Sequence, residues 1–207
     1  GNRGLGVDHD PELVARSTEL ARRDGIGDKV SFVQQDLFET DIAPATIVTM
    51  YLLPAVNLKL RPKLLATLQP GTRIVSHDFD MGDWTADESV EMYSKLKYGE
   101  TGGNSKIFLW VVPADVAGRW QWRMQLGGQD VDYDLRVVQR YQKLDGLIRV
   151  NGEVKKLENI TLRGDALAFT VVGEVKGSTV HQRFDGRVNA DALSGSVTLS
   201  GPRMQGA

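Results

Sequence analysis

The sequence predicts an α/β protein with a doubly wound, mostly parallel sheet in its first half and an all-β domain in its second half. Up to about residue 79, short apolar segments alternate with segments of helical periodicity, which is typical of parallel strands joined by helices. After Pro113, short segments of alternating polarity follow one another between Gly, Asn and Asp turns, the pattern of an antiparallel sandwich or small barrel. We therefore expect two domains, 1–113 and 114–207.

The first expected elements are a strand, a helix and a second strand. Residues 5–7 form a short apolar strand. Asp10 and Pro11 suit the cap and the first position of a helix, which a Gly-containing turn at 24–27 ends. Residues 30–33 are the second strand.

Two more strands with a helix between them are expected next. Residues 45–53 are a longer apolar strand, residues 60–68 a helix, and residues 73–79 a further strand. Residues 89–93 and 106–112 then flank a Gly-rich turn and predict an antiparallel hairpin. The alternative is a helix opened by the capping box Thr-Ala-Asp-Glu at 85–88.

The second half predicts strands only. Each expected segment alternates apolar and polar residues, which places one side chain of every two on a buried face. The aromatic residues Trp120, Trp122, Tyr133 and Tyr141 are expected in its core or in cross-strand pairs. The expected strands are 120–126, 133–141, 147–150, 166–172, 180–184 and 193–199.

Composition excludes several classes of function. The chain has 25 Lys and Arg against 27 Asp and Glu, a formal net charge of −2, so it lacks the basic surplus that attracts nucleic-acid phosphates. It contains no cysteine, which excludes disulfides and thiolate chemistry. No apolar run approaches the roughly 18 residues that span a bilayer. We expect no nucleic-acid partner, no membrane segment and no metal site.

Two acidic residues follow neighbouring strands of the expected sheet. Asp8 ends the first strand, where a carboxylate can accept hydrogen bonds from both hydroxyls of a ribose. Asp36 lies 28 residues later, after the next strand. There a carboxylate can accept from an adenine amino group while the following backbone N–H meets a ring nitrogen. The structural alternatives are a helix cap for Asp8 and a local turn for Asp36.

Three segments resemble the class I S-adenosylmethionine-dependent methyltransferases, in the correct order. GLGVDHDPELV at 4–14 is similar to their second strand with its ribose-binding acid. VSFVQQDLF at 30–38 is similar to their adenine loop, and LQPGTRIVS at 68–76 to their turn into the fifth strand. The resemblance covers about residues 1–113.

The resemblance implies a Rossmann-like methyltransferase sheet and S-adenosylmethionine as cofactor. The strand and Gly-x-Gly-x-Gly loop that hold the methionine part of the cofactor in this family are expected before Gly1. We therefore expect the sheet to be truncated at its N-terminus and residues 1–207 alone to be inactive, binding the cofactor in the millimolar range at best. The cofactor-binding residues implied are Asp8, His9, Asp36, Leu37, Met50 and Tyr51.

A narrower resemblance concerns the acceptor. MYLLP at 50–54, SHDF at 76–79 and the pair Asp83-Trp84 are similar to a protein-lysine methyltransferase family. Its eukaryotic members act on mitochondrial membrane proteins such as the ATP synthase c-subunit and the adenine nucleotide translocase, and it has bacterial relatives. The resemblance implies an acceptor site lined by Pro54, Asn57 and Trp84, with Tyr51, His77 and Asp78 as catalytic candidates.

The leading hypothesis is therefore methylation of lysine in a protein, with the β-domain helping to recognise that protein, in the cytoplasm. One alternative is a small-molecule methyltransferase whose β-domain serves as a lid or dimerisation module. The other is a non-catalytic ligand-binding protein with a vestigial methyltransferase fold. An intact Gly-rich loop upstream would favour either enzyme over the third hypothesis.

Overall fold

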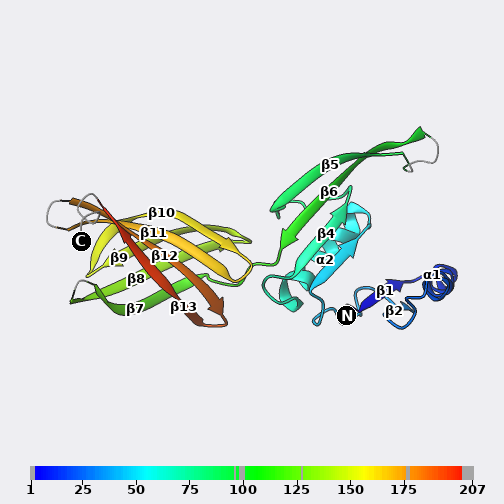
Figure 1. The fold of residues 1–207 in the computed structure, drawn as a ribbon, viewed down its shortest axis with the longest axis horizontal. Helices are drawn as coiled ribbons and strands as arrows, with labels where there is room; N and C mark the ends of the chain where they lie inside the picture. The colour runs from blue at the N-terminus through cyan, green and yellow to red at the C-terminus, as the bar shows by residue number, and fades with distance from the viewer. Residues whose placement is uncertain (1–2, 96, 98–100, 127, 176–177, 202–207) are drawn as a thin grey trace.

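The computed structural model describes residues 3–95, 97, 101–126, 128–175 and 178–201. Its strands form three sheets, of two, four and seven strands, which follow one another along an elongated molecule (Figure 1). Helices occur only with the two smaller sheets in the part of the chain described. The expected order, parallel strands and helices first and antiparallel strands afterwards, is confirmed.

The first sheet is a strand–helix–strand unit. β1 (Gly4–Asp8) and β2 (Val30–Gln34) are parallel, with Gly4 opposite Val30 and Asp8 opposite Gln34. Between them runs α1 (Pro11–Arg23), whose first turn is capped by Asp10 through a 2.8 Å bond from the backbone N–H of Glu12. The helix therefore begins where the sequence predicts, with a carboxylate near its positive end.

The second sheet has the order β3-β4-β6-β5. β3 (Ile47–Met50) is parallel to β4 (Arg73–His77). β6 (Gly103–Val111) is antiparallel to both β4 and β5 (Glu88–Ser94). The predicted hairpin is thus confirmed.

The alternative, a helix opened by the capping box at 85–88, is wrong. Asp87 bonds to the neighbouring strand instead of capping a helix. Its backbone N–H donates to Leu109 at 2.9 Å, and its carboxylate accepts from the N–H of Val111 at 2.7 Å. Cross-strand bonds therefore replace the local cap.

Helix α2 (Pro54–Thr67) begins six residues earlier than expected. Pro54 suits its first turn, because backbone N–H groups in the first turn of a helix have no partner within the helix, so proline loses no hydrogen bond by lacking one. Because the helix begins at Pro54, the expected strand 45–53 is shortened to β3. The helix buries Asn57, Leu60 and Leu64 against one face of the second sheet.

The third sheet is a single antiparallel meander in the order β13-β12-β11-β10-β9-β8-β7. The sheet is curled (Figure 1), and its first and last described strands do not pair with each other. The expected sandwich or barrel is corrected to a half-barrel, because β7 and β13 each pair on one side only in the described sheet. Its strands are β7 (Gly118–Leu126), β8 (Gln129–Arg140), β9 (Lys143–Val150), β10 (Glu153–Arg163), β11 (Ala166–Val175), β12 (Ser178–Asn189) and β13 (Ala192–Ser200).

Strand β10 was not predicted from the sequence. Its pairing with β11 shifts register between Glu158 and Thr161. Asn159, between them, has a positive φ of 52°. A bulge of this kind interrupts the alternation on which strand prediction depends.

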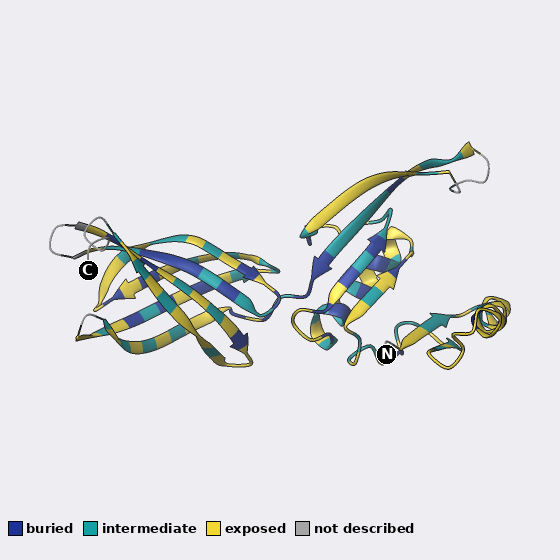
Figure 2. Cartoon of the chain, viewed as in Figure 1, coloured by how far each residue is buried: buried dark blue, intermediate teal, exposed yellow. Residues whose placement is uncertain are grey.

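Buried apolar residues form two clusters on either side of Pro113. One lies inside the curled sheet and includes Leu135, Ile148 and Phe169; the other lies between α2 and the second sheet and includes Leu64 and Trp110. In contrast, Ala21 is the one buried residue of α1, and no described residue of the first unit joins either cluster. The burial colours in Figure 2 show the same contrast.

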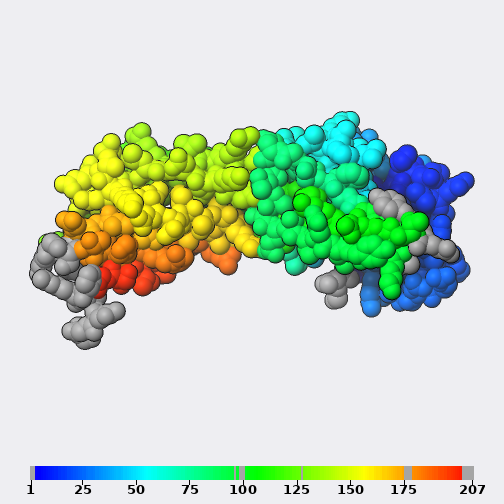
Figure 3. All heavy atoms as spheres, turned by 90° about the horizontal axis from the view of Figure 1, so that it is seen from above, coloured from blue at the N-terminus to red at the C-terminus, as the bar shows by residue number. Residues whose placement is uncertain are grey.

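The second and third sheets are joined by side chains as well as by the chain itself. The Trp84 ring stacks on Tyr141 with centroids 5.7 Å apart, and its Nε1 donates to Gln142 Oε1 at 3.0 Å. Asp83 accepts from Arg61 at 2.5 Å and from Arg140 at 2.7 Å. We call this set of contacts the junction. The space-filling view shows the two parts in direct contact (Figure 3).

The turn between β10 and β11 adds a close backbone contact to the junction. Gly164 has φ of 60°, and a Cβ added there would lie 3.0 Å from the Cα of Gly71. The backbone N–H of Ala114 donates to the carbonyl of Gly164 at 2.8 Å. Only glycine allows this approach without displacing the neighbouring backbone.

Among the described residues, no helix combines the length and the apolar character that crossing a membrane requires.

Candidate functional site

Asp8 and Asp36 follow the two parallel strands of the first unit at the same edge. Asp8 is the last residue of β1 and lies opposite Gln34, the last residue of β2; Asp36 comes two residues later. The two acids therefore occupy the expected places at the carboxyl ends of neighbouring strands.

The Asp8 carboxylate is partly held by its own loop. Its Oδ1 accepts from the backbone N–H of Asp10 at 3.0 Å and lies 3.3 Å from His9 Nδ1. The Asp8 side chain is 40% exposed and that of His9 is 95% exposed. Both side chains are accessible to a ligand at this edge.

The loop that carries Asp36 is fastened to the second sheet rather than to the first. Leu37 and Phe38 pack against the cluster under α2. Lys63 donates to the Phe38 carbonyl at 2.6 Å, and the Lys59 ammonium lies 4.2 Å from the Phe38 ring centroid. Asp36 is exposed and its Oδ1 accepts from the N–H of Phe38 at 2.8 Å. The local turn expected as the structural alternative is therefore present, and it uses one carboxylate oxygen.

Tyr51 and His77 meet at the carboxyl ends of β3 and β4. Their ring centroids are 4.6 Å apart, and the Tyr51 ring also stacks near Phe79 at 6.3 Å. Tyr51 is 65% exposed, whereas Met50, the last residue of β3, is buried under α2. Pro54, at the start of α2, is exposed beside them.

His77 and Asp78 are held by residues of the neighbouring hairpin. His77 Nε2 lies 2.7 Å from Ser105 Oγ and 3.6 Å from Asp78 Oδ1. Asp78 Oδ2 accepts from Lys97 Nζ at 2.5 Å, and its Oδ1 accepts from the N–H of Lys106 at 3.0 Å. The Lys97 ammonium and the Lys106 N–H hold the pKa of Asp78 below its usual value, so this carboxylate is ionised at neutral pH.

Ser105 and Lys97 were not predicted as site residues. Both lie far from His77 in sequence, and neither belongs to a recognisable motif. The missing information was the register of β6 with β4, in which Ile107 lies opposite His77. Residues two apart on a strand share a face, so Ser105 lies on the same face as His77.

The Tyr51, His77 and Ser105 side chains lie on the face of the second sheet opposite α2. Opposed residues share a face, which places Val90 and Met92 beside Ile107 and Ser105. Val90 is 58% exposed and Met92 is 54% exposed. Strand β5 is exposed along most of its length (Figure 2). The candidate site is therefore open on this face.

Two expected acceptor residues are buried in this structure. Asn57 is fully buried, and its amide donates to Ser76 Oγ and to the carbonyls of Phe79 and Asp80 at 3.2–3.3 Å. Trp84 is fully buried at the junction. Neither has surface for an acceptor in this conformation. Asn57 fixes the loop after β4, and Trp84 fixes the half-barrel.

In the described part of the chain, the two smaller sheets each end in a parallel strand that has a single pairing partner. β1 pairs with β2 alone and β3 with β4 alone among the described strands. Each sheet thus ends in an unpaired edge of a parallel strand pair, and the candidate residues lie after the carboxyl ends of these strands.

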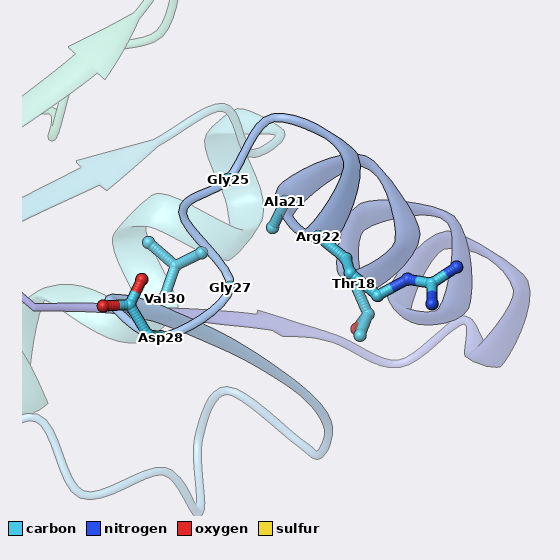
Figure 4. Close-up of a pocket in the computed structure, with 7 residues that line it drawn as sticks. All are labelled: Thr18, Ala21, Arg22, Gly25, Gly27, Asp28 and Val30. Carbon is cyan, nitrogen blue, oxygen red and sulfur yellow. The ribbon is translucent and has the colours of Figure 1, made fainter.

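A hollow beside α1 is unrelated to these residues. It is lined by Thr18, Ala21, Arg22, Gly25, Gly27, Asp28 and Val30 (Figure 4). Val30 is the first residue of β2, and Asp36 follows its last residue. The hollow therefore lies at the opposite end of the strand from the two acids, under a helix that has little to pack against.

Comparisons with known proteins point to one kind of enzyme. Residues 1–88 match the family described as the ANTKMT methyltransferase domain. A protein-lysine N-methyltransferase of Saccharolobus islandicus is 36% identical over 110 residues, which are 53% of this chain and 65% of that protein. The chain thus spans less than two thirds of the length of this curated relative.

Two solved structures match the chain, one over about half of it and one over nearly all of it. An RNA methyltransferase from Salinibacter ruber, in complex with S-adenosyl-L-homocysteine, is 46% identical, with 55% of this chain and 68% of that chain covered and a TM-score of 0.48. An S-adenosylmethionine-dependent methyltransferase from Clostridium acetobutylicum is 10% identical, with 98% of this chain and 58% of that chain covered and a TM-score of 0.31.

Proposed function

We propose that this chain, whose residues 1–88 match the ANTKMT methyltransferase domain, acts in the transfer of a methyl group from S-adenosylmethionine to a lysine side chain of a protein. The observation that carries the proposal is that Asp8, Asp36, Tyr51 and His77 each lie at or just after the carboxyl end of a parallel strand, the first two in one strand pair and the last two in the other. In open α/β sheets, ligands bind at these ends, where the strand order reverses.

The two smaller sheets are, in this proposal, the two parts of one Rossmann-like sheet. A strand inserted between β1 and β3 would satisfy both unpaired edges and would give each backbone N–H and C=O along them a partner. It would also give α1 a neighbour, since α1 now buries Ala21 alone.

The described residues fit the adenosine half of the cofactor. The hydrogen bond that Asp8 accepts from its own loop falls on Oδ1, which leaves Oδ2 for the ribose hydroxyls. The bond from Phe38 falls on Oδ1 of Asp36, which leaves Oδ2 for the adenine amino group. The Leu37 backbone N–H is then the donor to the ring, and His9 covers one side of it. No described strand pairs with both β1 and β3, where this proposal places the strand and loop that hold the methionine half.

When bound, the cofactor supplies an electrophilic methyl group on a sulfonium. The protein has to align the acceptor with that methyl group and to exclude water from it. Tyr51 and Pro54 are exposed at the carboxyl end of β3, so we assign them to the acceptor side. Met50 lies beneath them and fixes the end of the strand.

Lysine is proposed as the acceptor because the Saccharolobus relative is a protein-lysine N-methyltransferase and because Tyr51 exposes an aromatic face suited to an ammonium group. The half-barrel is proposed to bind the protein that carries the lysine. We also propose that the boundary between the two domains lies near Pro113, since Val112 belongs to one apolar cluster and Ala114 to the other. A cytoplasmic location completes the proposal.

The test is methyl transfer by the chain extended ahead of Gly1 with a strand and Gly-x-Gly-x-Gly loop. Labelled S-adenosylmethionine is offered with bacterial protein extract, RNA and a small-amine mixture in separate reactions, and methylated protein is mapped by mass spectrometry. Label on lysine, lost in Asp8→Ala, supports the proposal. Label on RNA or small amines only overturns the proposed acceptor, and absence of cofactor binding overturns the proposed site.

A further inference from the structure

We propose that Ser105 and Asp78 are positioning residues that hold His77 as the tautomer with its proton on Nε2, so that Nδ1 is free to take a proton from the acceptor amine. The inference rests on the proposed lysine methylation, because a lysine ammonium has no lone pair until it loses a proton. It adds to that function a base and the two groups that orient it.

Ser105 fixes the orientation of the His77 ring. Its hydroxyl oxygen lies 2.7 Å from His77 Nε2, and Ser105 is 5% exposed while the His77 side chain is 33% exposed. The hydrogen bond therefore lies on the buried side of the ring. A hydroxyl can donate or accept, so Ser105 alone does not decide which nitrogen carries the proton.

Asp78 decides the position of the proton. Its Oδ1 lies 3.6 Å from His77 Nε2, and a carboxylate at this distance favours an N–H and disfavours a lone pair facing it. Lys97 and the N–H of Lys106 keep Asp78 ionised through hydrogen bonds of 2.5 Å and 3.0 Å. Nε2 therefore donates to Ser105 Oγ, and the neutral ring carries its lone pair on Nδ1.

The backbone at Asp78 is built for this contact. Its φ is 64°, a left-handed conformation that is uncommon for a residue with a side chain. The backbone N–H of Asp78 donates to the carbonyl of Lys106 at 2.6 Å, while its carboxylate accepts from the N–H of the same residue. Such local strain persists where the surrounding contacts determine it, and it is common at functional sites.

Nδ1 remains for a ligand. Within the described residues, no hydrogen bond engages this nitrogen, and the nearest ring neighbour is Tyr51 with centroids 4.6 Å apart. The charged or titratable groups that face His77 are Asp78 on its own strand end, Lys97 from the hairpin and Tyr51 after β3. The acceptor would approach along the exposed Tyr51 ring.

The step that follows is a proton transfer. An N–H bond of the acceptor ammonium breaks, its proton goes to His77 Nδ1, and the electron pair stays on the acceptor nitrogen. The ring becomes an imidazolium that Asp78 and Ser105 stabilise through Nε2–H. The amine then has the lone pair with which it would attack the methyl carbon of a bound cofactor, as the carbon–sulfur bond breaks and its electron pair stays on the sulfur. His77 returns its proton to water afterwards.

The first test reads the tautomer without any methyl transfer. Long-range ¹H–¹⁵N correlation spectra distinguish the two ring nitrogens, and the chain has only 3 histidines, so His77→Gln identifies the signal. We expect His77 in residues 1–207 to be the Nε2–H tautomer at neutral pH, and a mixture of tautomers in Ser105→Ala and Asp78→Asn. Ser89→Ala, an exposed serine on β5, is the matched control and should leave the spectrum unchanged. An Nδ1–H tautomer in the unmodified chain would overturn the proposal.

The second test uses the chain extended ahead of Gly1 by the strand and Gly-rich loop described above. His77→Gln should lower kcat about 100-fold at pH 7, in the range usual for a general base. The loss should shrink as pH rises toward about 10, the ordinary pKa of lysine, because the acceptor then loses its proton to solvent. A loss that is equal at all pH values would mean a structural role and overturn the assignment of His77. If the unmodified protein methylates no lysine, the proposed function itself fails. The tautomer measurement needs no methyl transfer, so it separates that failure from a failure of the His77 assignment.

Discussion

The first unit and the half-barrel differ in how they are stabilised, although each is built from short, regular elements. The half-barrel encloses a cluster of 12 buried residues, whereas α1 buries Ala21 alone and leaves Leu13 and Leu20 exposed. Buried apolar area is the main favourable term in folding. The half-barrel is therefore stabilised by its own core, and the unit that carries Asp8 depends on a neighbour. The edge that we propose to bind the cofactor therefore belongs to the part of the molecule with the smaller buried core.

The largest expected effect, a test of the contrast between the half-barrel and the first unit, comes from truncating a core side chain of the half-barrel. Phe169 is 1% exposed and packs on Phe184 with centroids 4.8 Å apart. Phe169→Ala should lower the free energy of unfolding of the half-barrel by about 3–5 kcal/mol. Leu13→Ala on α1, which is 47% exposed, should change it by less than about 0.5 kcal/mol. Urea unfolding followed by tryptophan fluorescence measures both, and equal effects would remove the contrast.

Cofactor affinity tests the dependence of the first unit on a neighbour. Residues 1–207 alone should bind S-adenosylmethionine in the millimolar range or not at all, because no described strand pairs with both β1 and β3. The chain extended by a strand and Gly-rich loop should gain about 4 kcal/mol, a thousandfold in affinity. Isothermal calorimetry on both proteins is the measurement. Micromolar binding by residues 1–207 would show that the strand is dispensable.

Asp8 should account for a smaller share of that affinity. In the extended protein, Asp8→Ala should weaken binding by about 1.5–3 kcal/mol, the range for hydrogen bonds to a charged group. Asp10→Ala serves as control, since its carboxylate caps α1 and does not point to a ligand. If both variants bind equally well, Asp8 has no role in the cofactor site.

The smallest expected effect is the loss at low pH of the stabilisation that Asp83 contributes at the junction. Hydrogen bonds from Arg140 and Arg61 lower the pKa of Asp83 to about 2 from its usual 3.8. Because the folded-state pKa is depressed, the stabilisation is complete above pH 4 and is lost as pH falls through 2. The difference in melting temperature between the unmodified chain and Asp83→Asn should therefore vanish across this window. A difference that is constant with pH would mean that the charge of Asp83 does not matter.

The sequence predicted those features that depend on local patterns. The cap at Asp10, the hairpin of β5 and β6 and the order of the two acids all follow from neighbours within a few residues or from alternation. Strand β10 was not predicted, because the bulge at Asn159 interrupts its alternation of apolar and polar residues. The start of α2 was missed because an apolar run does not by itself distinguish strand from helix.

The candidate site was predictable only in part, because several of its contacts join distant parts of the chain. Tyr51, His77 and Asp78 were expected and lie together. Ser105 enters through the register of β6 with β4, which a single sequence does not reveal. Asn57 and Trp84 are side chains with polar groups that could line a site or satisfy a buried loop equally well. Their roles here depend on distant partners, the Phe79 carbonyl for Asn57 and the Tyr141 ring for Trp84.

The junction has a mechanical consequence. Stacking of Trp84 on Tyr141, the ion pairs of Asp83 and the backbone contact at Gly164 fix the half-barrel at three points. The half-barrel is therefore a stiff arm rather than a tethered module. If a partner protein binds along that arm, the arm determines how far from the docking point a lysine has to lie to reach Tyr51. The distance between the docking point and Tyr51, and not the residues next to the lysine, would then select which lysine is modified.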